Sequence, residues 1–258
     1  MHYKKIKEIK KKILKVAFEV KEGHIGSSFS ILDILYLLYN NVLNITPETV
    51  NSPNRDFLIL SKAHASLAHS AILLEKGYIN EDQFFSYCKH ESILGGHLDR
   101  MKVPGVEVSA GSLGHGIGVS IGIALAAKIK NKDNSIFVIV GDGEINEGTF
   151  WESSMLASHH QLSNLCCIID YNHSNDRSLE ISPLDKKLNS FGWEVNEING
   201  HSHKEILNVF SKKLSNKPRA IIANTIKGQG VSCMENNPAW HHKFPNEEEY
   251  KLIMKELT

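Results

Sequence analysis

The second half of the chain alternates short, mostly apolar segments with segments of helical periodicity, and this alternation restricts the fold more than any other feature of the sequence. It predicts strands at Ile136–Val140, Leu165–Ile169, Glu194–Ile198 and Ala220–Thr225, and helices at Gly148–Leu162, Leu184–Phe191 and Ser202–Leu214. Apolar strands joined by helices are typical of a parallel sheet that is covered on both faces. We therefore expect an α/β fold, a parallel sheet with helices on both faces.

The first half of the chain predicts three helices and one strand. Ser30-x-x-Asp33 resembles a capping box and is expected to begin the second helix. Gly23 and Gly77 are expected to end the first and third helices. The predicted elements are a helix over Ile6–Val20, a helix after Ser30, a buried strand at Asp56–Leu60 and a helix over Ala65–Lys76. No repeat or long linker divides the sequence, so we expect a single domain, residues 1–258.

The charge of the chain argues against a large class of functions. Its 29 Lys and Arg balance its 29 Asp and Glu, which leaves no positive excess to neutralise the phosphates of a nucleic acid. No apolar run approaches the ~18 residues that a membrane span needs. The lysine-rich start also lacks the apolar segment of a secretion signal. We expect a cytoplasmic protein that binds neither nucleic acid nor membranes.

Cysteine and histidine pairs give no metal-binding signature. His159-His160 and His201-x-His203 do not form HExxH, so these histidines are expected to be solvated polar residues. The cysteines show no CxxC spacing, which favours reduced, buried thiols over a zinc or redox motif. They are Cys88, Cys166, Cys167 and Cys233.

Oxygen-bearing side chains follow two of the predicted strands. Asp142 comes after Ile136–Val140, between two glycines, and Asn172 follows the strand that ends near Ile169. If these strands are neighbours, the two side chains converge at the carboxyl edge of the sheet, where ligands bind in open parallel sheets. Mg²⁺ takes such oxygen ligands together with phosphate oxygens, and the glycines leave room for a diphosphate. The sequence favours this site over nucleotide motifs, because it contains neither GxxxxGK[ST] nor GxGxxG.

These residues also carry a family resemblance. Gly141-Asp142-Gly143 followed by Tyr171-Asn172 resembles the thiamine-diphosphate motif of transketolases, which begins GDG and ends NN. Further segments resemble transketolase motifs in the family's order: Gly23–Ser28 (GHPGSS), Ser61–Ala65 (SKGHA), Gly96-His97, Val103–Ile117 (PGVEVTTGPLGQGI), and Thr225–Gly230 with Trp240–His242. Together they extend over nearly the whole chain, which is far more specific than any one motif.

The resemblance implies thiamine diphosphate and Mg²⁺ as cofactors. The Mg²⁺ ligands would be Asp142, Asn172 and the carbonyl oxygen of Ser174. Contacts to thiamine diphosphate would come from Ser27, His64, Gly111, Ser112, Leu113, Gly143, Glu144, Asn172, Lys227 and His241. Within this set, the loop 111–113 would line the aminopyrimidine, and the backbone amides of residues 143 and 144 would meet the diphosphate.

The resemblance also implies catalytic residues. His24, His64, His97 and His241 would surround the reacting carbon and contact the hydroxyls of the donor sugar. Neutral imidazoles can exchange protons with sugar alkoxides near pH 7. Glu147 matches an acidic residue that belongs, in transketolases, to a carboxylate network between two cofactor sites. An equally acceptable interpretation of Glu147 is an acid that complements the dipole of a helix N-terminus.

Transketolases are more than twice as long as this chain, which resembles their first domain only. The resemblance therefore implies a split transketolase of the pentose phosphate pathway, active only with a C-terminal subunit that carries the pyrimidine-binding and C-terminal domains. We expect two copies of each subunit, with sugar phosphates as substrates. The reaction would transfer a two-carbon ketol unit from a ketose phosphate to an aldose.

Several other functions are compatible with the sequence. The nearest is the alpha subunit of a thiamine-dependent 2-oxo-acid dehydrogenase; a relative that makes deoxyxylulose phosphate is normally one long chain. Four residues depart from the family pattern: Ser112, His115, Ser174 and His242. The departures at Ser112, His115 and His242 leave open a split transketolase that acts on an unusual sugar. The remaining alternatives are a non-catalytic scaffold subunit or, more distantly, a zinc hydrolase.

Overall fold

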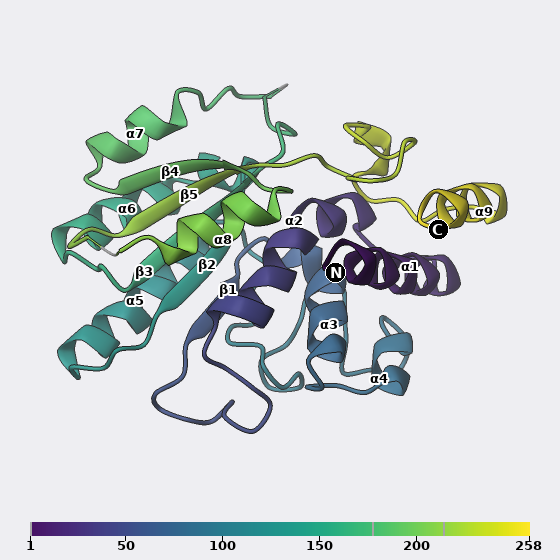
Figure 1. Ribbon diagram of the computed structural model, residues 1–258, viewed down its shortest axis with the longest axis horizontal. Helices are drawn as coiled ribbons and strands as arrows, with labels where there is room; N and C mark the ends of the chain where they lie inside the picture. Colours follow the sequence, from purple (N-terminus) through teal and green to yellow (C-terminus); the bar gives the residue numbers. More distant parts are fainter. Residues whose placement is uncertain (1, 177, 214) are drawn as a thin grey trace.

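Five short strands pair in parallel to form one sheet, in the order β1-β2-β3-β5-β4 (Figure 1). The computed structural model describes residues 2–176, 178–213 and 215–258. The strands are β1 (Phe57–Leu60), β2 (Ile136–Gly141), β3 (Leu165–Tyr171), β4 (Glu194–Asn199) and β5 (Arg219–Asn224). Each strand lies within two residues of its predicted bounds, and the prediction of an α/β fold with a parallel sheet is confirmed.

The helices are α1 (His2–Val20), α2 (Ile25–Leu37), α3 (Ser66–Glu75), α4 (Glu81–Phe85), α5 (His115–Ile129), α6 (Gly148–His159), α7 (Leu184–Ser190), α8 (His203–Ser211) and α9 (Glu247–Glu256). Short 3₁₀ turns lie at Ala63–Ala65, Gly143–Asn146 and Pro238–Trp240, and one π-helical turn lies at Leu38–Val42. The first 3₁₀ turn joins β1 to α3, and the second joins β2 to α6.

Two hydrophobic cores lie on opposite faces of the sheet, because successive side chains of a strand point in opposite directions. In β2, Phe137 and Ile139 belong to the core that α1, α2, α3 and α8 cover, whereas Val138 and Val140 belong to the core beneath α5, α6 and α7. Figure 1 shows α2 and α8 on the near side of the sheet and α6 on its far side. Burial on both faces explains why β2 is apolar throughout and why β3 and β5 are apolar over most of their length.

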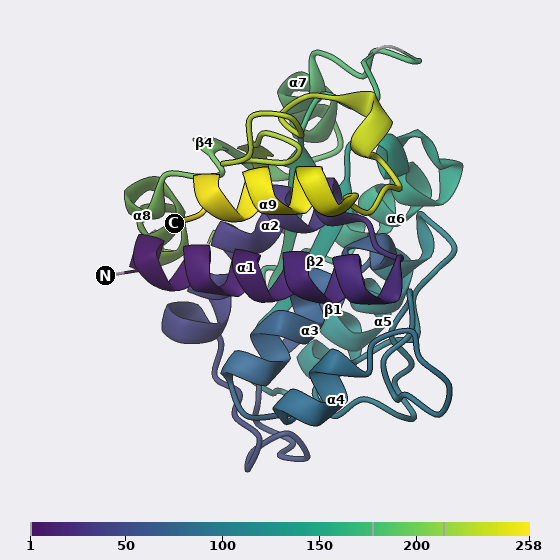
Figure 2. The same ribbon diagram turned by 90° about the vertical axis from the view of Figure 1, so that its right-hand side faces the viewer.

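The first and last helices lie side by side outside α2 (Figure 2). Phe18 of α1 stacks on Tyr250 of α9, with ring centroids 4.4 Å apart. The α9 helix begins at a capping box, in which Asn246 and Glu249 exchange side-chain to backbone hydrogen bonds. The segment between β5 and α9 therefore runs from the carboxyl end of β5 to the side of the molecule where α1 lies.

Three sequence predictions about helices need correction. The second helix begins at Ile25 rather than after Ser30, whose hydroxyl lies inside α2 and donates to the Ser27 carbonyl (3.0 Å) and to Asp170 Oδ2 (2.7 Å). Helices α4, α5 and α9 are absent from the predicted elements. The helix predicted over Ser202–Leu214 ends at Ser211, and Leu214 lies outside the described residues.

The cysteines are free thiols, and two of them are not buried as predicted. Cys166 and Cys167 are buried in β3, whereas Cys88 and Cys233 are exposed. Within the described ranges, no helix is both long and apolar enough to cross a membrane.

Candidate active site

The carboxyl ends of β2 and β3 form the floor of a cavity of about 210 Å³. The two strands are neighbours, as the interpretation of Asp142 and Asn172 requires, and Gly141 is paired with Asp170 in the register. Most of the residues that the resemblance assigns to the cofactors line this cavity: Ser27, His64, Leu113, Asp142, Gly143, Glu144, Asn172, Ser174, Lys227 and His241. They come from loops far apart in the sequence that meet at one edge of the sheet.

The Asp142 carboxylate joins the two strand ends. Its Oδ1 accepts a hydrogen bond from the Gly143 amide (2.8 Å), and its Oδ2 accepts one from the Asn175 amide (3.3 Å). Burial, followed by the negative charge of Asp170, raises the pKa of Asp142. A buried carboxylate that faces a second carboxylate is a position where a bound cation lowers the free energy of the charged form.

The Asn172 amide turns its oxygen toward Ser174 and its nitrogen toward the cavity floor. Its Oδ1 accepts hydrogen bonds from the Ser174 amide (3.2 Å) and hydroxyl, and its Nδ2 donates to Asp170 Oδ2 (3.1 Å). The donation to a carboxylate fixes which end of the amide is the oxygen. That oxygen therefore lines the same cavity as the Asp142 carboxylate.

A buried ion pair beneath the cavity was not assigned any role from the sequence. The Lys62 ammonium bonds Asp170 Oδ2 with both side chains almost fully enclosed, and Ser30, Thr225 and Asn172 also donate to this carboxylate. Burial alone would raise the pKa of Asp170, but the Lys62 charge and these hydrogen bonds together lower it. Desolvated charges are tolerated when they are paired and hydrogen-bonded, so this cluster is a fixed, ionised floor.

Glu144 fastens three loops around the cavity through its side chain. Its Oε1 accepts hydrogen bonds from the Ser61 hydroxyl and the Gly114 amide (2.8 Å), and its Oε2 accepts one from the Gly141 amide (3.2 Å). Burial raises the pKa of Glu144. The carboxylate thus positions the loops before α3 and α5 against the end of β2.

Three histidines lie together at the mouth of the cavity. The His24 ring centroid is 5.3 Å from that of His64 and 5.6 Å from that of His241, and the last two are 6.0 Å apart. Burial, followed by the nearby imidazoles of His242 and His241, lowers the pKa of His24 to about 4. Burial, followed by the Lys62 charge, lowers the pKa of His64 to about 2. Both rings are therefore uncharged at neutral pH.

Lys227 extends this group toward the floor. Its ammonium donates to His241 Nδ1 (2.7 Å), which leaves Nε2 of that ring available to other partners. Burial, followed by the Lys227 charge, lowers the pKa of His241. Burial, followed by the Lys62 charge, also lowers the pKa of Lys227. A cation beside uncharged imidazoles makes this wall suited to an anionic ligand such as a diphosphate.

A family model described as transketolase, thiamine diphosphate binding domain, matches residues 2–257. The chain belongs to the transketolase family. One relative is an apulose-4-phosphate transketolase subunit from Actinobacillus succinogenes, which is 40% identical over 98% of this chain and 95% of its own length. Another is the 6-deoxy-6-sulfo-D-fructose transketolase subunit SqwG of Clostridium sp. (strain MSTE9), which is 36% identical over 96% of this chain and 93% of its own length.

Solved transketolase structures share the fold of this chain. The transketolase from Campylobacter jejuni superimposes with a TM-score of 0.88 and 29% identity over 98% of the chain. This chain covers 41% of that protein. The transketolase-family chain described here therefore spans less than half of a solved transketolase, whereas it spans nearly all of its subunit relatives.

The donor set of the cavity fits the cofactors of a transketolase. Asp142 and Asn172 contribute a carboxylate and an amide oxygen, which are hard ligands of the kind Mg²⁺ takes. The Ser174 hydroxyl that now bonds the Asn172 oxygen would give way to a metal, while the Ser174 amide bond can remain. Lys227 supplies positive charge on the opposite wall. The residues present thus match a diphosphate that is held through a divalent cation.

Five residues assigned by the resemblance do not line the cavity in this transketolase chain. One is His24, which instead lies next to His64 and His241, two residues that do line it. Gly111, Ser112 and His97 are exposed, and Glu147 is exposed at the N-cap position of α6. His97 lies beside the 111–113 loop, since a Cβ on Gly111 would be 3.9 Å from its Cδ2. Their assigned roles stay predictions.

Proposed function

We propose that this chain is the diphosphate- and Mg²⁺-binding subunit of a split transketolase. Its residues 1–258 would form one domain of that enzyme. The observation that carries the proposal is that two oxygen donors, Asp142 and Asn172, share one cavity with the uncharged rings of His64 and His241. A scaffold subunit would not need this combination of a metal-ligand pair and uncharged bases at one site.

The proposed reaction moves a two-carbon ketol unit from a ketose phosphate to an aldose. When bound, thiamine diphosphate supplies the carbon that accepts this unit. Asp142 and Asn172 would hold Mg²⁺ with the Ser174 carbonyl oxygen, and Lys227 would face the diphosphate. His24 and His64 would accept and return the protons of sugar hydroxyls, because uncharged imidazoles have a free lone pair at neutral pH. His241, whose Nδ1 accepts from the Lys227 ammonium, would donate a hydrogen bond from Nε2. His97 would contact the donor sugar and Glu147 would belong to a carboxylate network between two cofactor sites, although neither residue lines the cavity.

A second subunit is part of the proposal. This chain covers more than nine-tenths of each relative named as a subunit but 41% of the solved transketolase. A reactive carbon nucleophile needs a water-poor site, whereas His241, which lines this cavity, is exposed to solvent. We therefore expect the C-terminal subunit to cover it, with two copies of each chain and the active sites at the interfaces.

The donor sugar is proposed to differ from the common pentose phosphates. The two relatives are named for apulose 4-phosphate and 6-deoxy-6-sulfo-D-fructose, and both are similar to this chain over more than nine-tenths of it. His242, at a position where the family has glycine, lies 4.5 Å from the ring of His24. An imidazole in place of glycine beside His24 would change the surface that a donor sugar meets there.

The decisive experiment purifies the tagged chain from its source cells together with whatever chain accompanies it, and assays the complex with Mg²⁺ and thiamine diphosphate. Xylulose 5-phosphate, apulose 4-phosphate and 6-deoxy-6-sulfofructose serve as alternative donors, with an aldose phosphate as acceptor. Transfer from apulose 4-phosphate or 6-deoxy-6-sulfofructose is the expected result. Transfer from xylulose 5-phosphate alone would support the split transketolase but contradict the proposed donor. Turnover of pyruvate without ketol transfer would instead identify a 2-oxo-acid dehydrogenase subunit.

The metal assignment has its own test in the same complex. Asp142→Ala is expected to abolish Mg²⁺-dependent binding of thiamine diphosphate, measured by calorimetry. Asp133→Ala is the matched control, because Asp133 is an exposed carboxylate that precedes β2, whereas Asp142 follows the other end of the same strand. Unchanged cofactor affinity in Asp142→Ala would refute the assignment.

A further inference from the structure

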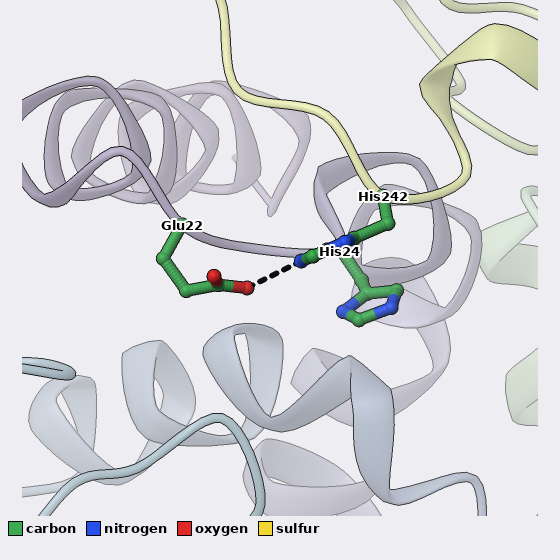
Figure 3. A group of neighbouring side chains, drawn as sticks. All are labelled: Glu22, His24 and His242. Atoms are coloured by element: carbon green, nitrogen blue, oxygen red, sulfur yellow. Dashed lines mark hydrogen bonds and ion pairs between the residues drawn. The ribbon is translucent and has the colours of Figure 1, made fainter.

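Two loops from opposite ends of the chain bring a carboxylate and two imidazoles together at the rim of the cavity (Figure 3). Glu22 and His24 lie between α1 and α2, and His242 lies between Trp240 and α9. One ligand atom from each of the three side chains lies within 4.8 Å of the other two. A parallel bridge between His24 and Lys243 fixes the two backbones beside each other.

The three side chains differ from an ordinary surface ion pair. His242 Nε2 is 2.5 Å from Glu22 Oε1, and the His242 ring is stacked on that of His24 at 24°. Figure 3 shows the His24 ring below this pair, with a nitrogen turned toward the Glu22 side. The exposed His242 side chain can rotate. After such a rotation, a single ion could contact one carboxylate oxygen of Glu22 and one nitrogen each of His24 and His242.

Two imidazoles and one carboxylate form a ligand set for a divalent transition metal ion. Zn²⁺ and its neighbours in the first transition row bind histidine nitrogen and carboxylate oxygen, with an open position left for water when there are three protein ligands. Mg²⁺ prefers oxygen ligands, so it would go to Asp142 and Asn172 instead. The two sites therefore differ in the hardness of their ligands.

Two other histidine groups show that this convergence is particular to the rim. His159 and His160 are neighbours on α6 with ring centroids 5.0 Å apart, and no acidic residue completes a metal-binding group with them among the described residues. In the second group, His201 and His203 bond different oxygens of Asp33, and His201 Nε2 already accepts the Ile226 amide. Neither group has three ligand atoms that can converge on one ion.

We infer that Glu22, His24 and His242 form a binding site for a Zn²⁺-class transition metal ion at the mouth of the reaction cavity. His24 belongs both to this site and to the group with His64 and His241, so a metal ion bound there holds the His24 nitrogen toward Glu22 and away from the cavity. Metal binding is expected to slow ketol transfer reversibly. This second consequence rests on the proposed function, whereas the binding itself does not.

The test of binding uses the full chain without an affinity tag, freed of metals and then supplied with excess Mg²⁺ to occupy the oxygen site. Co²⁺ is the spectroscopic probe, because its visible absorption reports nitrogen ligation, and Zn²⁺ affinity is measured by calorimetry. One ion should bind per chain. Glu22→Gln and His242→Gln should each weaken binding by more than about tenfold, since even residues that merely orient a metal ligand cost that much when removed. His159→Gln, the matched control, should bind as the wild type does.

Equal affinity in the wild type, Glu22→Gln and His242→Gln would overturn the site, as would the absence of Co²⁺ binding when Mg²⁺ is present. The functional arm titrates Zn²⁺ into the complex with the second subunit. Transfer should fall and recover with a chelator, and Glu22→Gln should need at least about tenfold more Zn²⁺. If Zn²⁺ binds but ketol transfer does not change, the metal ion does not hold the His24 nitrogen away from the cavity, and that part of the inference is refuted. A complex with no transfer activity would refute the proposed function and leave the Co²⁺ result to decide the site.

Discussion

Two groups of histidines differ in what their rings bond. At the mouth of the cavity, His24, His64 and His241 face one another, and burial holds the pKa of each below its usual range. Between α2 and α8, His201 and His203 instead bond the two oxygens of the buried Asp33 at 3.0 and 2.7 Å. The first group is uncharged and accessible, whereas the second is anchored to a carboxylate.

The difference separates histidines that can do chemistry from histidines that hold the fold. Asp33 lies in α2, and its bonds to His201 and His203 fasten that helix to the loop between β4 and α8 and to the start of α8 itself. A ring whose nitrogens are committed to structural partners cannot shuttle protons. Residue type alone does not make this distinction, because both groups are histidines in helix termini or loops.

The largest effect is expected for the cavity group. His64→Ala should lower the rate of ketol transfer by the complex about 10²- to 10⁴-fold, the usual contribution of a proton-transfer group. Its free energy of unfolding should change by less than about 1 kcal/mol. His203→Ala is the matched substitution in the other group and should have the reverse pattern, with reduced stability and little change in rate. Equal rate losses in the two variants would remove the distinction.

A loss of stability is expected when the anchor is changed. Asp33→Asn keeps the shape of the side chain but removes the charge that accepts two imidazole hydrogen bonds. The free energy of unfolding should fall by about 2 kcal/mol, the range for buried hydrogen bonds to a charged group. Urea denaturation at neutral pH measures it. Wild-type stability in this variant would mean that Asp33 does not anchor His201 and His203.

The Asp33 carboxylate should also make the free energy of unfolding depend on pH. Burial alone would raise the pKa of Asp33, but hydrogen bonds from His201 and His203 lower it from 3.8 to about 2. A depressed folded-state pKa stabilises the protein above the unfolded value and loses that effect as the pH falls through the folded value. The stability difference between wild type and Asp33→Asn should thus be constant above pH ~5 and shrink between pH ~4 and ~2. A difference that grows toward acid would contradict the assignment.

The smallest effect is expected at the rim. The ion pair between Glu22 and His242 is largely exposed, and such pairs contribute about 0–1 kcal/mol. His242→Gly should therefore change the free energy of unfolding by less than about 0.5 kcal/mol in the absence of transition metals. A loss comparable to that of Asp33→Asn would place His242 among the residues that hold the fold.

Strands β1, β2 and β3 were predictable because burial on both faces leaves a nearly uninterrupted apolar signal, whereas β4 is mostly polar and only its Ile198 is buried. Helix α5 was not, since Gly116, Gly118 and Gly122 count against a helix in its first half. The structure explains one of them: a Cβ on Gly116 would clash with the Ser61 side chain, so only glycine allows this approach. The start of α2 was missed for the same reason, because Gly26 and two serines give no helical periodicity.

The cavity was predictable as far as strand order determines it. Asp142 and Asn172 follow adjacent strands, so their convergence follows from a parallel sheet alone. The pairing of Lys62 with Asp170 does not follow from strand order. The two residues are 108 positions apart in the sequence, and only the packing of β1, α2 and β3 brings them together. A lysine and an aspartate inside otherwise apolar segments were the available signal, since charges are rarely buried without a partner.

The Glu144 carboxylate has a consequence for the motions of the chain. Because it holds the Ser61 hydroxyl, the Gly114 amide and the Gly141 amide at the end of β2 at once, neither of the two loops can move away without breaking a hydrogen bond to this one carboxylate. The loops should therefore open as one cooperative unit, so that the Gly114 and Gly141 amides exchange with deuterium at the same rate. In Glu144→Gln they should exchange faster and independently of each other. In the wild-type chain, by contrast, the loops that Glu144 binds would move together because one side chain connects them.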